Sequence, residues 1–203
     1  MIRVLIADDH KIVRDGLRRI LAAQPGVEVA AEAADGDQAL ALVRANAYDV
    51  ALLDLSMPGL SGIDLIKRLR IERPGLRLLV LSMHGEDQYA ARALKAGASG
   101  YLNKDSAAEM LVGALRKVAA GGVHIGEAAA ASLVASASAH QALSNREFEV
   151  LRLLVEGKSQ TDIAEQLHLS VKTVSTHKTR LQEKLGLKST AELVRYALEN
   201  RLF

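Results

Sequence analysis

Two kinds of hydrophobic pattern divide the chain. Over residues 1–118, short apolar runs alternate with helix-length amphipathic segments. The runs are 3–7, 27–33, 49–54, 76–82 and 100–102, and the helical segments between and after them include 35–46, 62–71, 86–96 and 106–118, which makes five strand–helix units. Apolar runs that need not alternate with polar residues indicate strands buried on both faces, hence a parallel sheet covered by helices. The pattern predicts a five-stranded, doubly wound α/β domain.

From Leu143 onward the periodicity is wholly helical. Ser144 with Glu147 and Ser189 with Glu192 have the spacing of capping boxes, which mark helix starts. A first helix should end at Gly157, and a last helix should run through about Arg201. Between them the sequence predicts a short helix at 160–167, a tight turn and a longer helix at 171–185 that Gly186 closes. Two helices joined by three or four residues form a helix-turn-helix, so residues 143–203 are predicted to be a small all-α domain.

The segment between these domains, residues 119–142, is rich in Ala, Ser and Gly and is predicted to be a linker containing some helix. Its two histidines, His124 and His140, are too isolated for a metal site and are expected to be solvated. The predicted organisation is therefore 1–118, linker 119–142 and 143–203.

Composition narrows the setting without identifying a partner. The 203 residues are 49% hydrophobic and 25% charged, which is globular composition, and a net charge of +2 does not by itself indicate nucleic acid. The absence of cysteine excludes disulfides, thiol nucleophiles and cysteine zinc sites. Since no apolar stretch approaches the 18 or so residues of a membrane span, a cytoplasmic protein without a membrane partner is expected.

Charged residues follow the predicted strands where each one ends. Asp8 and Asp9 close the first strand and Asp54 closes the third, so the three carboxylates converge if those strands are neighbours. Such a set favours a hard cation, and Mg²⁺ accepts carboxylates while it keeps water and phosphate ligands. The alternative is that the aspartates only cap the following helices. Ser82 and Lys104 end the next two strands, where a hydroxyl and an ammonium can contact a phosphoryl group.

The 171–185 helix has the charge pattern of a DNA-binding element. Val174, Leu181 and Leu185 share the face that should pack inward. The opposite face is small and polar, with Lys172, Ser175, Thr176, Thr179 and Glu183. Residues 170–188 hold five basic side chains and one acidic one in a chain that is nearly neutral overall. Basic side chains suit phosphates and short hydroxyls suit base edges, so the pattern favours DNA over a merely solvated face.

The first domain resembles the receiver domains of two-component response regulators in its motifs "DDH", "LLDLSMPGLSG", "LS" and "GYLNKD". The resemblance implies a flavodoxin-like fold in which Asp54 accepts a phosphoryl group from a sensor histidine kinase or a small phosphodonor. It implies Mg²⁺ held by Asp8, Asp9, Asp54 and the main-chain carbonyl of Ser56. Ser82 and Lys104 would contact the phosphoryl oxygens, and Tyr101 would be the aromatic that turns inward with Ser82.

Asp105 follows Lys104 where many receivers have proline, which leaves the geometry of that peptide bond open. His10 is expected to begin the first helix without a part in the chemistry.

The segment from "LSNREFEVLRLL" to "HKTRLQEKLGL" resembles the LuxR-type output domain of the NarL/FixJ response regulators. The resemblance implies base-reading positions at Ser175, Thr176 and Thr179. It implies contacts to the DNA backbone from Lys172, Thr173, Lys178 and Arg180. It also implies dimerisation through the last helix, whose apolar residues are Leu193, Val194, Ala197, Leu198 and Leu202.

Together these features predict a phosphorylation-dependent transcriptional regulator of a bacterial two-component system, which binds promoter DNA and is a homodimer when phosphorylated. It would not be an enzyme beyond slow autodephosphorylation. One alternative is a Mg²⁺-dependent aspartyl-phosphate phosphatase, which usually has a second acid two residues after the nucleophile, where this chain has Ser56. Another is a receiver that acts only through protein contacts or binds RNA.

Overall fold

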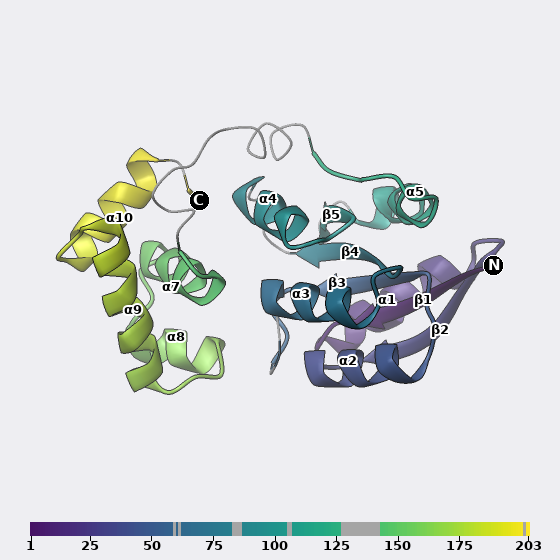
Figure 1. Cartoon of the computed structure of the whole chain (residues 1–203), viewed down its shortest axis with the longest axis horizontal. Helices are drawn as coiled ribbons and strands as arrows, with labels where there is room; N and C mark the ends of the chain where they lie inside the picture. Colours follow the sequence, from purple (N-terminus) through teal and green to yellow (C-terminus); the bar gives the residue numbers. More distant parts are fainter. Residues whose placement is uncertain (59, 61, 83–86, 105–106, 127–142, 201) are drawn as a thin grey trace. The chain divides into compact units, whose positions relative to one another are not determined.

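A computed structural model of the whole chain describes all residues except 59, 61, 83–86, 105–106, 127–142 and 201. The chain divides into two compact units, Met1–Val134 and Ala135–Phe203, called here the N-terminal and C-terminal units (Figure 1). The boundary between them falls outside the described residues, as does His140. None of the helices described is both long enough and apolar enough to cross a membrane.

The N-terminal unit contains the predicted five-stranded parallel sheet. Its strands are β1 (Ile2–Ala7), β2 (Val27–Ala33), β3 (Val50–Asp54), β4 (Arg77–Ser82) and β5 (Gly100–Asn103), each within two residues of the predicted bounds. They lie in the order β2-β1-β3-β4-β5. Because β1 pairs directly with β3, the condition for bringing the three aspartates together is met.

Helices cover both faces of this sheet, as expected for a doubly wound fold (Figure 1). They are α1 (Lys11–Ala22), α2 (Gly36–Ala45), α3 (Gly62–Glu72), α4 (Asp87–Lys95) and α5 (Ala107–Ala119). One buried cluster joins alternate strand residues such as Ile6 and Leu52 to Leu21 of α1 and Leu115 of α5. Successive strand residues point to opposite faces, so Leu5 and its equivalents form the core under the other helices.

The sheet continues beyond the predicted end of the first domain. The backbone of His124 pairs with β5: its N–H donates to the carbonyl of Ser99 (3.1 Å) and its carbonyl accepts from the N–H of Tyr101 (2.8 Å). His124 is half-buried, and desolvation lowers its pKa. The expectation of a solvated linker histidine was therefore wrong, because this segment covers the edge strand and satisfies its backbone groups.

The C-terminal unit is a bundle of four described helices, α7 (Asn145–Val155), α8 (Gln160–Gln166), α9 (Val171–Leu185) and α10 (Thr190–Glu199). Their core includes Phe148, Leu151, Ile163, Leu181 and Leu193, all fully buried. The short α8 and the longer α9 are joined by four residues, and His168 takes a positive φ of 52° in this turn. The helix-turn-helix predicted from the sequence is present (Figure 1).

Polar side chains begin each of these helices. The capping boxes predicted at Ser144 and Ser189 are both formed. A third, Ser159 with Asp162, starts α8 and follows the same Ser-x-x-acid pattern, which the sequence analysis did not use. The last helix ends at Glu199, two residues before the predicted end, and Asn200 closes it by donating its side-chain amide to the carbonyl of Tyr196 at 2.8 Å.

Candidate functional site

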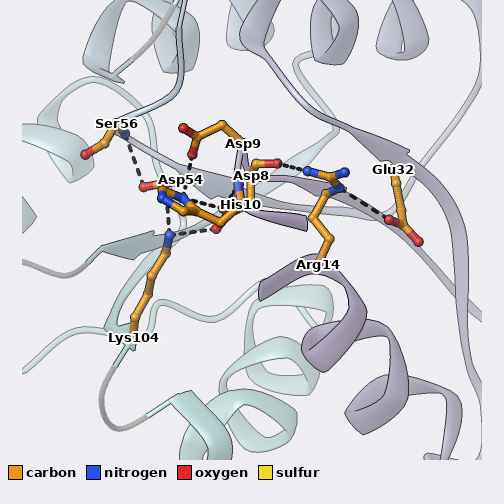
Figure 2. A network of polar contacts seen from close by, with 8 residues as sticks. All are labelled: Asp8, Asp9, His10, Arg14, Glu32, Asp54, Ser56 and Lys104. Atoms are coloured by element: carbon orange, nitrogen blue, oxygen red, sulfur yellow. Dashed lines mark hydrogen bonds and ion pairs between the residues drawn. The ribbon is translucent and has the colours of Figure 1, made fainter. Parts of the chain in front are cut away.

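The carboxyl edge of the sheet gathers the charged residues that follow three strands. Asp8 comes after β1, Asp54 ends β3 and Lys104 comes directly after β5. Nζ of Lys104 lies 2.6 Å from Oδ2 of Asp8 and 2.9 Å from Oδ2 of Asp54 (Figure 2). One ammonium group is thus shared by two carboxylates that are 46 residues apart in the sequence.

The other oxygen of each carboxylate accepts a backbone hydrogen bond. Oδ1 of Asp8 accepts from the N–H of His10 at 2.9 Å, and Oδ1 of Asp54 accepts from the N–H of Ser56 at 3.1 Å. These bonds fix the turns that leave β1 and β3. Neither aspartate caps the following helix, because His10 is the N-cap of α1 and α3 begins at Gly62. One oxygen of each aspartate closes a local turn and the other is oriented toward Lys104.

Burial sets the electrostatics of the pocket. Asp8 and Asp54 are 1% and 3% exposed. Desolvation, with a smaller contribution from the neighbouring charge of Asp8, raises the pKa of Asp54 above its usual value, although Lys104 opposes the shift. Desolvation also disfavours the charged form of Lys104, but the two aspartates outweigh it and raise the pKa of the ammonium group.

Asp9 and His10 complete a cluster of potential metal ligands. One ligand atom from each of Asp8, Asp9, His10 and Asp54 lies within 4.8 Å of the others. Among the described residues, Oδ1 of Asp9 is a buried oxygen that accepts no hydrogen bond, whereas Oδ2 of Asp8 is paired with Lys104. Buried carboxylate oxygens without donors are costly unless a cation compensates them, so this set fits a hard divalent ion.

Two residues that the sequence analysis missed support the end of β1. Nη1 of Arg14, on α1, donates to the main-chain carbonyl of Asp8 at 2.6 Å. Nε of Arg14 lies 3.4 Å from Glu32 of β2 (Figure 2). Glu32 also pairs with Arg18. Arg14 thereby ties the acidic turn to the neighbouring strand. Sequence spacing carried no signal for this pair, because it depends on the register of β1 against β2.

The remaining predicted residues of the pocket lie near the same edge. Ser82 ends β4 and Tyr101 lies on β5, and both are buried. Ser56 is exposed in the turn after β3. The start of α2 packs tightly on the loop after β3: a Cβ atom on Gly36 would lie 1.5 Å from the carbonyl oxygen of Leu60. Asp105 lies outside the described residues.

Helix α9 displays most of the predicted DNA-contacting residues. Val174 and Leu181 are buried, whereas Leu185 is half-buried. Of the seven predicted contacts, five are exposed and two are half-buried. The exposed ones are Lys172, Ser175, Thr176, Thr179 and Arg180, and the half-buried ones are Thr173 and Lys178.

Three hydroxyl groups at the start of and along this helix bond to its backbone. Ser170 caps the helix by accepting from the N–H of Thr173 at 3.1 Å. Oγ1 of Thr176 donates to the carbonyl of Lys172 at 3.0 Å, and Oγ1 of Thr179 donates to the carbonyl of Ser175 at 3.1 Å. Each threonine therefore presents oxygen lone pairs and a methyl group outward, without a hydroxyl proton.

One basic residue of the helix pairs with a buried acid of the same unit. Nζ of Lys184 donates to Oε2 of Glu147 at 2.7 Å, and the N–H of Ser144 donates to the same oxygen at 2.6 Å. Desolvation would raise the pKa of Glu147, but Lys184 and the Ser144 hydrogen bonds outweigh it and lower the pKa. Part of the positive charge counted on this helix is thus neutralised within the unit.

Both units of the chain match known protein families. Residues 4–116 match the response regulator receiver domain, and residues 141–197 match the bacterial regulatory proteins of the luxR family. The chain is 35% identical to the response regulator UvrY of Escherichia coli over 209 residues, which cover all of this chain and 96% of UvrY. It is 41% identical to the oxygen regulatory protein NreC of Staphylococcus epidermidis over 214 residues, 98% of each chain.

A solved structure is similar to this chain over most of its length. The structure of two RcsB dimers bound to two parallel DNAs has a TM-score of 0.62 and 33% sequence identity, and the match covers 96% of both chains. The strand-end carboxylates and the helix-turn-helix therefore occur in a protein whose full length matches known regulators. The chain belongs to the NarL/FixJ family of two-component response regulators, in which a receiver domain controls a LuxR-type DNA-binding domain.

Proposed function

We propose that Asp54 is the residue that accepts the phosphoryl group from a sensor histidine kinase. The observation that carries this proposal is its buried carboxylate, held 2.9 Å from Lys104 beside two further carboxylates. An Asp54 oxygen would attack phosphorus in line with the bond to the donor nitrogen or oxygen, which leaves with the bonding electrons. Phosphoryl transfer needs little beyond this alignment and neutralisation of the equatorial oxygens.

The neighbouring residues have matching roles in this proposal. Lys104 moves its charge from the carboxylate pair to a phosphoryl oxygen, and the hydroxyl of Ser82 donates a hydrogen bond to another. Tyr101 then packs toward Ser82 and transmits the change to the surface near α4 and β5.

Mg²⁺ would be held by Asp8, Asp9, Asp54 and the main-chain carbonyl of Ser56. When bound, it neutralises charge on the phosphoryl oxygens. The buried Oδ1 of Asp9, which accepts no hydrogen bond, supports this assignment. Stable phosphatase turnover is not part of the proposal, because Ser56 stands where such enzymes usually have a second acid.

Labelling by a radioactive phosphodonor tests the phosphoacceptor. Asp54→Asn should abolish hydroxylamine-sensitive labelling, because an amide cannot form an acyl phosphate. Asp37→Asn, at an exposed acid in the first turn of α2, is the matched control and should label fully. Asp9→Asn should keep the nucleophile but need more Mg²⁺. Stoichiometric labelling of Asp54→Asn would remove Asp54 from its role, and an unchanged metal requirement in Asp9→Asn would make the acidic pair structural.

For the C-terminal unit we propose that α9 enters the major groove of promoter DNA. Lys172, Thr173, Lys178 and Arg180 would contact the backbone, and Ser175, Thr176 and Thr179 would face base edges. RcsB, a relative of similar length, is solved with DNA, which supports the choice of partner. Because Thr176 and Thr179 donate their protons within the helix, they would accept from the exocyclic amines of adenine or cytosine, or contact a thymine methyl.

Salt-dependent DNA binding separates the two kinds of contact. Lys178→Ala and Arg180→Ala should weaken binding to all sequences and flatten the salt dependence by about one unit of slope for each lost phosphate contact. Thr176→Val keeps the methyl group and removes the oxygen, so it should cost about 1–3 kcal/mol on the preferred site if the oxygen reads a base. Equal losses on preferred and random DNA would place Thr176 outside the base-reading class.

We further propose that phosphorylation favours a homodimer that pairs two output units through α10, acting in the cytoplasm where the DNA lies. Leu193, Ala197 and Leu202 are buried in the unit's own core, whereas Val194 is half-buried and Leu198 is 61% exposed. The apolar surface left for a partner is thus narrower than the sequence suggested and centres on Leu198. Sedimentation of phosphorylated wild type and Leu198→Lys tests this surface: a variant that still dimerises would exclude it.

A further inference from the structure

The imidazole of His10 lies in the acidic cluster without a role in the function proposed above. Its Nδ1 is 2.8 Å from Oδ1 of Asp9 and 3.4 Å from Oδ1 of Asp8. Figure 2 shows the ring turned toward these carboxylates. His10 occupies the N-cap position of α1, but its side chain makes no capping hydrogen bond. Helix capping therefore does not explain why the ring takes this position.

The contact between His10 and Asp9 lacks the geometry of a hydrogen bond. Oδ1 of Asp9 is a buried atom that accepts no hydrogen bond, although Nδ1 of His10 is 2.8 Å away. Asp8 differs, because its Oδ2 is paired with the ammonium group of Lys104 at 2.6 Å and its Oδ1 accepts from the N–H of His10. A buried carboxylate oxygen of Asp9 and a ring nitrogen of His10 thus lie close together without a hydrogen bond between them.

These spacings match neighbouring ligands of one metal ion. Ligand bonds of about 2.0–2.2 Å that meet at a right angle place two ligand atoms about 3 Å apart. The separations of 2.8 and 3.4 Å bracket that value. The upper bound of 4.8 Å among the four candidate ligand atoms leaves room for ligands on opposite sides of the same ion.

We propose that His10 is a nitrogen ligand in this pocket, which makes it a mixed oxygen and nitrogen site for a borderline divalent transition ion in addition to Mg²⁺. The proposal rests on the proposed function, in which Asp8, Asp9 and Asp54 bind a divalent cation. Mg²⁺ is satisfied by carboxylates and water and gains little from imidazole. Ions such as Zn²⁺ or Co²⁺ accept imidazole readily, so the ring raises the affinity of the pocket for them selectively.

Titration of the full-length protein with CoCl₂ and MgCl₂ tests the proposal. His10→Ala should weaken Co²⁺ binding by about tenfold or more, since losing even a residue that only orients a ligand has effects of that order. Its Mg²⁺ affinity should stay nearly unchanged. His10→Asn is the second variant, because asparagine is favoured at a helix N-cap and protects the fold of α1.

A matched control removes a different exposed histidine. His168→Asn, in the C-terminal unit, should leave Co²⁺ binding unchanged, and asparagine tolerates the positive φ of 52° at this position. The proton NMR spectrum of the Co²⁺ form gives a readout that is independent of phosphorylation. Wild type and His168→Asn should show paramagnetically shifted imidazole signals that His10→Ala lacks.

The possible failures are distinguishable. Equal Co²⁺ affinity and the same shifted signals in His10→Ala and wild type would overturn His10 as a ligand and leave the Mg²⁺ pocket intact. A wild-type protein that binds neither ion, or an Asp9→Asn variant that binds both as well as wild type, would overturn the cation pocket itself and the proposal with it.

Discussion

Each unit of the protein holds a lysine against a buried carboxylate, and the two pairs have opposite electrostatic outcomes. In the N-terminal unit, Lys104 lies 2.9 Å from Asp54, and the pKa of Asp54 is raised. In the C-terminal unit, Lys184 lies 2.7 Å from Glu147, and the pKa of Glu147 is lowered. Similar distances between similar groups thus leave one carboxylate less acidic and the other more acidic than in solution.

The difference comes from the balance between desolvation and the groups around each carboxylate. Asp54 is desolvated, and the neighbouring charge of Asp8, which also contacts Lys104, adds to the rise in its pKa. Glu147 is also desolvated, but Lys184 and a hydrogen bond from Ser144 together outweigh the desolvation. The first arrangement keeps a carboxylate in a costly state, as suits the nucleophile proposed above, and the second fixes a helix start. A buried ion pair is therefore functional or structural according to its surroundings.

Removing the lysines should give the largest contrast. Lys104→Met leaves Asp8 and Asp54 as two buried carboxylates without a cation, and breaking a buried pair in this way costs about 3–5 kcal/mol. The side chain of Lys184 is 39% exposed, and its removal leaves the carboxylate of Glu147 with its hydrogen bonds from Ser144. We expect Lys184→Met to cost about 1 kcal/mol or less, the scale of a partly exposed pair. A urea titration that is monitored by the hydrogen exchange of backbone amides in β3 and α7 measures the free energy of unfolding of each unit separately.

A second substitution tests whether repulsion between Asp8 and Asp54 causes the loss of stability in Lys104→Met. Lys104→Met combined with Asp54→Asn should recover most of the stability, because only Asp8 then remains charged. If the double variant is as unstable as Lys104→Met alone, lost packing of the lysine side chain, and not charge, is the reason.

Glu147→Gln should have the next largest effect. It removes the charge that Lys184 and Ser144 both contact, and we expect about 1–2 kcal/mol, typical of losing a helix cap together with a charged hydrogen bond. Because the pKa of Glu147 is lowered below 4.5, its stabilising contribution is present above that pH and lost as the pH falls through the folded value. The deficit of Glu147→Gln should therefore shrink in acid. A deficit that is constant across this range would assign the effect to packing.

The sequence predicted those parts of the molecule that follow from regular geometry. Asp8, Asp54 and Lys104 could be placed together because parallel strands end at one edge of a sheet. The support given by Arg14 and Glu32 could not be, because it depends on side-chain reach across strands whose register only folding sets.

Dependence on contacts between distant parts of the chain also explains the other differences between the predictions and the structure. His124 was assigned to the linker because its surroundings are rich in Ala and Gly, but its role is carried by backbone groups that pair with β5 and leave no trace in composition. Lys184 was counted with the DNA-facing charges because helical spacing gives a direction and not a partner, and its partner Glu147 is 37 residues away. Long-range pairs are the part of a site that local patterns miss.

The smallest expected effect has the opposite sign and is the most direct test of the comparison. In Mg²⁺-free buffer, Asp54→Asn should stabilise the N-terminal unit by about 1 kcal/mol or less, the usual scale of a single substitution, although it should abolish phosphorylation.

The reason for this stabilisation is that the pKa of Asp54 is raised in the folded state. A folded state that holds this proton more tightly than the unfolded chain loses stability as the pH rises from 3.8 through the folded pKa, and the loss is complete above the folded pKa. Asparagine has no such loss, so its advantage should grow as the pH rises through this range and should disappear below 3.8, the reverse of the behaviour of Glu147→Gln. Added Mg²⁺ should make wild type more stable than Asp54→Asn, because the folded wild-type pocket binds the ion and the variant lacks one of its carboxylates. A neutral-pH Asp54→Asn protein that is less stable than wild type without Mg²⁺ would mean that Lys104 compensates Asp54 fully and that the two lysine pairs do not differ in kind.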